Sequence, residues 1–251
     1  YRFGCRPPTD GLSIVRQQLR AAHDYANELT SIERGRRHAI RALLESDDEV
    51  RAASDLLKQA TRSTRKASMA SLREVRRRAL EERGDDLAGI KEREGMILRD
   101  ARALTECFWG SYLDVEAAHR QSRSAPLYGD DGLTPSDPRF VSWRGDGLTS
   151  GQVGIQIQGG LSTADAMRST DNRVRLVLET DRRDGAGRSP NARRACRRYG
   201  HLWLRVGSDG RDPVWARAPI LIHRAIPESA TWKWVRLSVR MVGLREEWTA
   251  E

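Results

Sequence analysis

The side chains that most often perform catalysis are scattered along this sequence. Its five histidines, His23, His38, His119, His201 and His223, are far apart, and none stands in a metalloprotease or zinc-site spacing. The sequence also has no G-x-x-x-x-G-K-[ST] phosphate loop, G-x-G-x-x-G turn or G-x-S-x-G nucleophile elbow. We therefore expect surface or capping histidines, and a chain with no catalytic residues and no metal site of its own.

Acidic clusters and cysteines lead to the same expectation. The acids at 47–49 and 85–86 stand at predicted helix starts, where a negative charge stabilises the helix dipole without any metal. Cys5, Cys107 and Cys196 are odd in number, far apart and in no C-x-x-C arrangement. This pattern argues against a disulfide framework and a zinc finger, and it favours a reducing, cytoplasmic setting.

Positive charge is the chemistry that the sequence does supply. The chain has 44 Lys plus Arg against 35 Asp plus Glu, a formal net charge of +9, which favours a polyanionic partner. Only Lys58, Lys66, Lys91 and Lys233 are lysines, so arginine supplies nearly all of the charge. Its planar fork suits phosphates and guanine edges. A basic protein that binds no nucleic acid is the alternative.

Two groups of side chains could contact nucleic acid more specifically. Gln17 and Arg20 lie three residues apart on a predicted helix that also carries Arg16 and Asn27, and Gln or Asn can read adenine while Arg can read guanine. The second half of the chain adds the tryptophans Trp143, Trp203, Trp215, Trp232 and Trp234. Aromatic rings among arginines can stack on bases, although core packing is the more common role for each ring taken singly.

Helical periodicity dominates the first half of the chain. Apolar residues recur at helical spacing from Leu12 onward, then over 47–83 and again over 85–124. The second of these tracts also has an arginine-rich face. We expect three long antiparallel helices that form an all-helical module over residues 9–124.

The pattern changes at Ser124, where prolines and glycines crowd together. Beyond it, alternating apolar residues predict strands at 153–157, 174–178, 202–206, 220–222 and 235–239. The fold class predicted is α+β, with an antiparallel barrel or sandwich in the second half. No apolar run is long enough to span a bilayer, so we expect no membrane partner.

Several motifs resemble the N-terminal part of TnpB-like nucleases and of the small type V CRISPR effectors, above all the compact subtype V-M. They are Tyr1–Pro8, Val15–Leu19, Ala22–Leu29, the aromatic turn Phe108–Tyr112, the P-R-F element Pro138–Phe140, and the runs His201–Val206 and Trp215–Ile220. The resemblance touches nearly the whole chain and is thin between Glu45 and Ala103.

This resemblance implies a β-barrel of the oligonucleotide-binding type, called the wedge domain, split by an inserted helical recognition lobe. Residues 1–8 would form the first wedge strand, 9–124 the lobe and 125–251 the rest of the barrel. A RuvC nuclease and a zinc-binding part, with their Mg²⁺ and Zn²⁺, would follow residue 251. The resemblance leaves open whether such a complete protein cleaves DNA.

The resemblance also implies RNA-guided DNA binding. A guide RNA pairs with the target strand of double-stranded DNA, while the protein, expected to act as a monomer, reads a short T-rich flanking motif. Arg16, Gln17, Arg20 and Asn27 would lie near the flanking duplex. Phosphates of RNA or of the heteroduplex would be held by Arg139, Arg144, Arg197 and Arg198, with stacking or support from Trp109 and Tyr112. Phe140 of the P-R-F element would also contact nucleic acid.

Two other functions fit parts of the sequence. A scaffold for protein–protein assembly would use the long helices as its interaction surface, but the serines and glycines between 63 and 95 interrupt the heptads that such a surface needs. An enzyme with an unfamiliar site would need converging acids and a pocket, which no motif in the sequence indicates.

Overall fold

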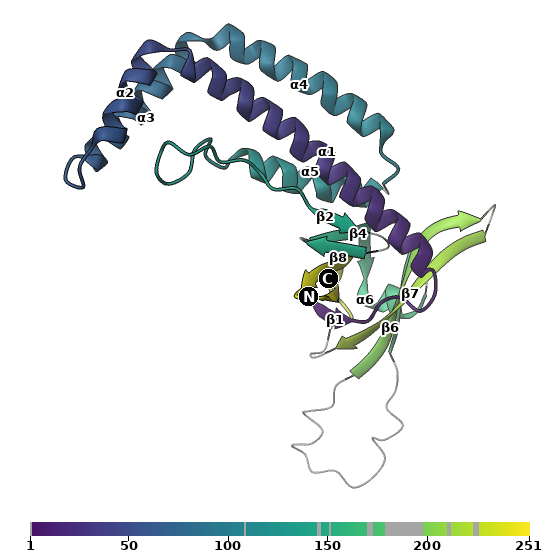
Figure 1. Ribbon diagram of the computed structural model, residues 1–251. Helices are drawn as coiled ribbons and strands as arrows, with labels where there is room; N and C mark the ends of the chain where they lie inside the picture. Colours follow the sequence, from purple (N-terminus) through teal and green to yellow (C-terminus); the bar gives the residue numbers. More distant parts are fainter. Residues whose placement is uncertain are drawn as a thin grey trace. The chain divides into compact units, whose positions relative to one another are not determined.

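The computed structural model describes residues 2–107, 109–144, 147–150, 152–169, 173–178, 198–209, 212–222 and 226–251. The described chain is α+β, as predicted (Figure 1). Its helices are α1 (Leu12–Glu45), α2 (Asp48–Gln59), α3 (Arg65–Glu82), α4 (Gly84–Leu104), α5 (Trp109–Arg123) and α6 (Thr163–Met167). Its strands are β1 (Phe3–Cys5), β2 (Ser142–Arg144), β3 (Gly147–Ser150), β4 (Gln152–Ser162), β5 (Val174–Leu178), β6 (Arg198–Asp209), β7 (Asp212–Ile222), β8 (Thr231–Val242) and β9 (Arg245–Ala250).

The chain divides into two compact units. The sheet unit consists of Tyr1–Tyr25, Glu106–Val115 and Val141–Glu251, and the helical unit of Ala26–Thr105 and Glu116–Phe140. Both α1 and α5 contribute residues to both units. Among the described residues, no helix is long and apolar enough to cross a membrane.

The first predicted helix is confirmed as the single helix α1, but the second predicted tract is wrong as one helix. Residues 47–83 form α2 and α3, separated by a turn in which the Thr64 hydroxyl accepts a hydrogen bond from the backbone N–H of Thr61 at 3.0 Å. Threonine side chains compete with the helical backbone in this way. The expected helix start is confirmed, because the Asp47 side chain accepts from the backbone N–H of Val50 at 3.1 Å.

The third predicted tract is also two helices. Residues 85–124 contain nearly all of α4, which begins at Gly84, and all of α5, with a break after Leu104. Thr105, at the C-terminal end of α4, has φ −77° and ψ 136°, an extended backbone that no helix can continue. The helical part therefore holds five helices where the apolar spacing predicted three.

The strands form one antiparallel sheet in the order β4-β8-β9-β1-β7-β6-β5, with β2 and β3 as a separate pair. The first strand of the chain lies in the middle of this sheet, because Gly4 pairs with Thr249 of β9 on one side and with Leu221 of β7 on the other. The five predicted strand runs fall within β4, β5, β6, β7 and β8.

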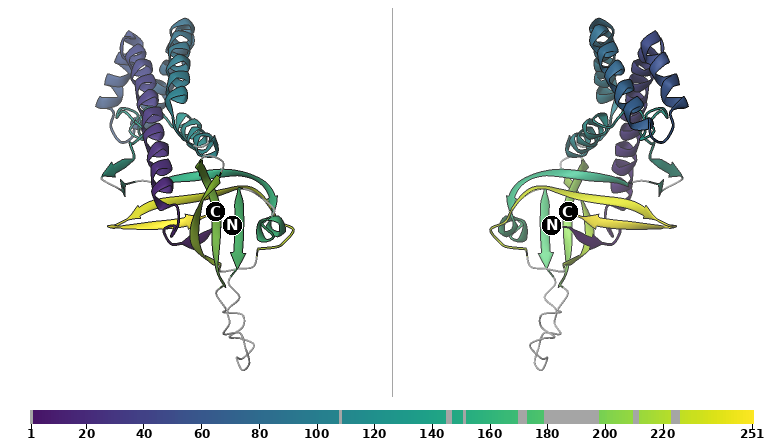
Figure 2. Two further views of the ribbon diagram at one scale, coloured as in Figure 1. Left: turned by 90° about the vertical axis from the view of Figure 1, so that its right-hand side faces the viewer. Right: turned by 90° about the vertical axis from the view of Figure 1, so that its left-hand side faces the viewer.

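The expected closed barrel is not what the described strands form. Their hydrogen bonds give an open sheet that ends at β4 on one side and β5 on the other. The short helix α6 follows β4 directly and packs against both edge strands (Figures 1 and 2). A capping box between Ser162 and Asp165 starts this helix, and Ala166 is fully buried. The helix thus lies between two strands that closure would have to pair.

Each unit has its own hydrophobic core. Alternation with period two builds the core of the sheet unit: Leu202, Leu204 and Val206 of β6 are buried, whereas Trp203 and Arg205 between them belong to the opposite face. The helical unit packs a separate cluster, with Ile40, Leu44, Val50, Ala53, Leu57, Leu72 and Ala79 as its buried members. These two cores hold the backbone that carries the predicted site residues.

Candidate nucleic-acid interface

The first turns of α1 carry three of the predicted site residues in the sheet unit. Gln17 and Arg20 are exposed, so both are available to a ligand. Arg16 is half-buried, and its guanidinium lies 3.3 Å from a carboxylate oxygen of Glu246 on β9. A ligand phosphate would have to compete with this carboxylate for Arg16, which makes Arg20 the more accessible cation.

Arg20 belongs to a small polar and aromatic group. Its Nε donates to the carboxylate of Asp24 at 3.0 Å, and its guanidinium lies 5.7 Å from the centroid of the Trp143 ring. His23 is buried and contacts Asp24 at 2.7 Å and the carbonyl oxygen of Val141 at 2.9 Å. The prediction that His23 is a surface or capping residue is therefore wrong: this histidine ties α1 to the chain before β2.

The aromatic turn at the start of α5 is placed by packing. Tyr112 is only 5% exposed and stacks on Tyr25, with ring centroids 5.7 Å apart. The Ser111 hydroxyl accepts from the backbone N–H of Gln156 on β4 at 3.0 Å. Tyr112 can thus support a neighbouring surface but cannot stack on a base. Trp109 begins α5, and its side chain lies outside the described part of the structure.

In the helical unit, Arg37 anchors the segment 122–137 to α1. Its side chain is buried, and its Nε donates to Glu33 at 2.8 Å. Its two terminal nitrogens donate at 2.7 to 3.0 Å to four carbonyl oxygens, those of Ser122, Ala125, Pro126 and Ser136. One turn further along α1, Arg41 forms hydrogen bonds of 2.8 and 3.2 Å with the two carboxylate oxygens of Asp137.

These anchors lead directly to the predicted P-R-F element. Arg139 and Phe140 are both exposed, and the guanidinium of Arg34, also exposed, lies 4.9 Å from the centroid of the Phe140 ring. Arg139 and Phe140 are therefore presented beside Arg34 of α1, on a segment whose backbone is held by Arg37 and Arg41. A phosphate with its neighbouring base is a ligand of matching chemistry.

The remaining predicted residues are less fully placed. Asn27 is half-buried on α1, in the helical unit. Arg144 ends β2 and Arg198 begins β6, but their side chains, like the whole of Arg197, lie outside the described residues. The structure therefore brings together two of the predicted sets: Gln17 with Arg20 on one helix, and Arg139 with Phe140 on one anchored segment.

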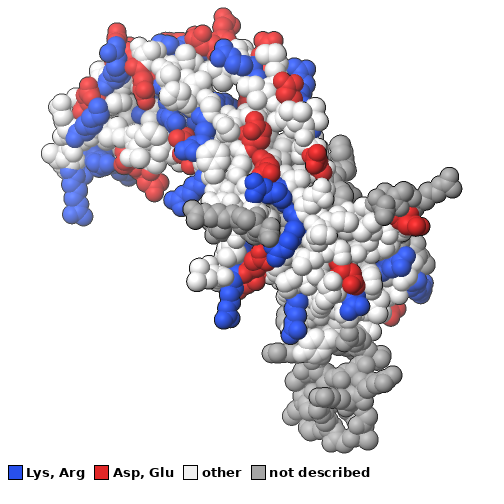
Figure 3. All heavy atoms as spheres, turned by 45° about the vertical axis from the view of Figure 1, so that its right-hand side comes forward, with Lys and Arg blue, Asp and Glu red and all other residues white. Residues whose placement is uncertain are grey.

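The arginine-rich face expected on 47–83 is partly neutralised. Arg77 pairs with Glu74 and Glu81, and Arg78 pairs with Glu49. Figure 3 likewise shows Lys and Arg interspersed with Asp and Glu over the helical part of the face that it displays. Charge is more one-sided near the start of α3, where the exposed cations are Arg62, Arg65, Lys66 and Arg73.

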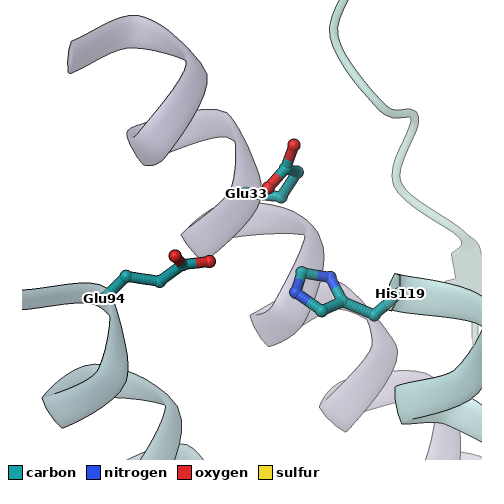
Figure 4. A group of neighbouring side chains, drawn as sticks. All are labelled: Glu33, Glu94 and His119. Atoms are coloured by element: carbon teal, nitrogen blue, oxygen red, sulfur yellow. The ribbon is translucent and has the colours of Figure 1, made fainter. Parts of the chain in front are cut away.

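One cluster of potential metal ligands occurs among the described residues. Glu33 of α1, Glu94 of α4 and His119 of α5 face one another, with one ligand atom from each within 4.8 Å of the others (Figure 4). Arginines already occupy both carboxylates: Arg36 donates to Glu33 at 2.7 Å, as Arg37 does at 2.8 Å, and Arg123 donates to Glu94 at 2.9 Å.

The charges of this cluster decide what it can do. Two carboxylates face three guanidinium groups, so a divalent cation would enter a site that is already net positive. Burial acts to raise the pKa of Glu33, but the hydrogen bonds from Arg36 and Arg37 outweigh it and hold the pKa below its usual value. The arrangement suits an ion-pair network that joins three helices better than a metal site.

Sequence reasoning missed Arg34, and it did not connect Trp143 to Arg20. A usable signal was present: Arg34, Arg37 and Arg41 recur at intervals of three and four residues, so they share one face of α1. The partners of that face lie about a hundred residues away in the chain, and no local pattern identifies them.

No protein-family model matches the chain. Two curated proteins, both named CRISPR-associated DNA-binding protein Cas12m, are similar to it. The protein from Pelobacter propionicus is 30% identical over 182 aligned positions, covering 66% of this chain and 26% of its own length. The protein from Allomeiothermus silvanus is 27% identical over 263 aligned positions, covering 99% of this chain and 44% of its own length.

The chain thus spans less than half the length of either relative. The second similarity nevertheless runs through both units, including the helical stretch where the motifs were thin. The resemblance to a type V-M CRISPR effector, predicted from the sequence, is confirmed by these Cas12m relatives.

Proposed function

We propose that this chain binds DNA under the direction of a guide RNA, as the wedge and recognition-lobe part of a type V-M effector. The observation that carries the proposal is the similarity over 99% of the chain to a protein named as a CRISPR-associated DNA-binding protein. In such a role base pairing selects the target, while the protein holds backbones and reads a short T-rich motif beside it.

The exposed surfaces support this division of labour. Gln17 and Arg20 lie three residues apart on α1, a spacing at which an amide and a guanidinium can reach neighbouring base edges in a major groove. Arg34, Arg139 and Phe140 offer charge and a ring without a rigid base-reading geometry, which suits the backbone of the guide–target heteroduplex.

The open sheet also fits the proposed wedge. Oligonucleotide-binding folds are partly open antiparallel barrels, and a sheet whose edge strands are separated by α6 is of that general form. The proposal assigns no DNA-cleaving residues and no metal to this chain, and it takes the effector to act as a monomer.

A binding titration tests the proposal. The purified chain is mixed with a Cas12m guide RNA and with labelled duplexes that carry a matching target beside a randomised flank, and bound duplexes are sequenced at several salt concentrations. We expect salt-graded, guide-dependent binding with enrichment of T-rich flanks.

The variant Gln17→Ala/Arg20→Ala should lose most of the flank enrichment while it still binds guide RNA. The control Arg99→Ala, which removes an exposed arginine from α4, should keep the enrichment. Binding that ignores the guide and does not discriminate among random polyanions would contradict the proposal and favour the protein scaffold.

A further inference from the structure

A second surface with nucleic-acid chemistry lies on the sheet, on the face turned away from the core. In β5, β6 and β7 the buried residues alternate with outward ones, as the period of a strand requires. The outward side chains include three arginines, two tryptophans and one histidine, namely Arg175, Arg205, Arg217, Trp203, Trp215 and His201. We call the five arginine and tryptophan residues the Arg–Trp face.

Strand register brings the members of this face together. Trp203 of β6 pairs with Arg175 of β5 on one side and with Arg217 of β7 on the other, and in the next row Arg205 pairs with Trp215. The guanidinium of Arg175 lies 4.2 Å from the ring centroid of Trp215, and that of Arg217 lies 5.7 Å from the ring centroid of Trp203. Each tryptophan therefore has a cation over its ring.

The charge of the face is one-sided. The outward positions from Arg173 to Val177, from Tyr199 to Gly207 and from Trp215 to Leu221 contain no carboxylate. Asp10 approaches from the chain after β1, with a carboxylate oxygen 3.6 Å from Nε of Arg217. One acid against three arginines leaves a net positive face whose complement is an anion.

One feature distinguishes this face from ordinary packing, namely apolar and aromatic side chains that are kept in solvent. On the same side of the strands Val177 is 45% exposed and Tyr199 is 55% exposed, although both could have been polar without cost to the core. Tyr199 stands four residues from Trp203, about 13 Å along the strand, which places a further ring in line.

We propose that the Arg–Trp face binds a single-stranded segment of RNA, its bases stacked on the guanidinium planes that lie over the tryptophan rings and its phosphates paired with the arginines. A single strand is required because bases inside a duplex do not present their faces to a protein. The ligand is RNA and not single-stranded DNA, because the face is already formed in the free chain and the guide RNA is the proposed permanent partner. Only that choice of source rests on the proposed function.

Binding of a short RNA to the full chain tests the inference. The probe is a fluorescein-labelled 12-nucleotide oligouridine, followed by anisotropy, with the DNA oligomer of the same sequence and a duplex DNA as parallel arms. Trp203→Leu removes the ring that supports the Arg217 guanidinium, and Arg175→Gln/Arg217→Gln removes two cations without touching the core. The matched control is Arg240→Gln on β8, an exposed sheet arginine paired with Glu247.

We expect Trp203→Leu to bind the RNA about tenfold more weakly, within the range for loss of one stacked base. The double arginine variant should lower the slope of log affinity against log salt by about 1.4, because each lost phosphate contact on a single strand removes about 0.7. Trp203→Phe should restore most of the affinity, and Arg240→Gln should bind as the unchanged chain does. Circular dichroism confirms that each variant is folded.

Several results would overturn the inference. RNA binding that survives both Trp203→Leu and the double arginine variant would mean that this face is not the site, and equal affinity for the DNA oligomer would remove the assignment to RNA. Duplex DNA separates the two proposals. If the chain fails to bind guide-matched duplexes but binds oligouridine through Trp203, the proposed function fails and the inference stands.

Discussion

Arginines serve opposite purposes in the two units of this chain. Along α1 in the helical unit, Arg37 is buried and forms hydrogen bonds with five acceptors, and Arg41 is committed to Asp137. On the Arg–Trp face of the sheet unit, Arg175 and Arg217 lie over aromatic rings, and Arg217 also faces Asp10 across 3.6 Å. The same residue type fixes a backbone in one place and in the other forms the cationic face that we propose as a ligand site.

The difference teaches where a basic sequence binds its partner. Net charge favours a polyanion but does not locate it, because arginines that satisfy carbonyls and carboxylates inside the fold have little left to offer. The carbonyl and carboxylate partners that the fold brings to each arginine, and not the density of arginines in the sequence, distinguish structural cations from binding ones. Five substitutions can break or sharpen this comparison.

The largest effect is expected from Arg37→Met. Loss of the guanidinium removes one of the two arginine partners of the buried Glu33 and one donor from each of four carbonyl oxygens, which should cost about 3–5 kcal/mol of unfolding free energy, measured by urea denaturation. Arg77→Met, at an exposed arginine of α3, is the control and should barely change stability. Equal stability of the two variants would show that Arg37 is not a structural arginine.

The next effect is expected from Phe140→Ala and Arg139→Ala, which act on the anchored segment's exposed end. If Phe140 stacks on an unpaired base beside the guide–target heteroduplex, its removal should weaken binding of guide-matched DNA about tenfold with the salt slope unchanged. Arg139→Ala should instead lower the salt slope by about 0.9, the value for one phosphate contact on a duplex. Both should unfold at the same urea concentration as the unchanged chain, whereas a shared loss of stability would reassign them to packing.

A pH effect of known direction is expected at His119. Burial lowers the pKa of His119, whose Nε2 is buried and has no hydrogen-bond partner among the described residues. A folded pKa below the unfolded value of about 6.5 means that the unfolded state binds the proton more readily, so stability should fall as the pH drops below about 6.5. His119→Asn should flatten the difference between unfolding curves at pH 7.5 and 5.5. A flatter curve in the unchanged chain than in the variant would contradict the burial argument.

The smallest effect is expected from Asp24→Asn. The carboxylate of Asp24 competes with a ligand for Arg20 across an exposed pair of 3.0 Å, and such helix pairs are weak. Its removal should strengthen duplex binding about twofold in low salt and leave binding unchanged in high salt. Asp55→Asn on α2, which frees Lys58 instead, serves as the control.

Much of the fold followed from residue patterns. Alternating apolar residues predicted β4 to β8, and the acids at 47–49 and 85–86 predicted two helix starts that the structure confirms. The break between α2 and α3 was missed because the turn at Thr61–Thr64 contains no Gly or Pro. The open sheet was missed because α6 is only five residues long, too short for a periodic signal.

The candidate site was less predictable, for a reason that Tyr112 and Arg16 illustrate. Their residue types suit nucleic acid, but Tyr112 is buried against Tyr25 and Arg16 faces Glu246, 230 positions away in the chain. Whether a side chain is exposed and unopposed depends on such distant contacts. The pairing of Trp203 with Arg217 has the same character, since strand register and not sequence proximity creates it.

The two-residue period of β6 has a consequence for how this protein can change over generations. Its inward residues belong to the core and its outward residues belong to the Arg–Trp face, so the same alternation in sequence determines both. A single inserted codon in the regularly paired part of the strand would turn arginine and tryptophan inward and leucine outward. Two inserted codons would keep both faces and slide the outward rows by one place, whereas an odd insertion could be taken up only at an irregularity such as the one between Arg205 and Gly207.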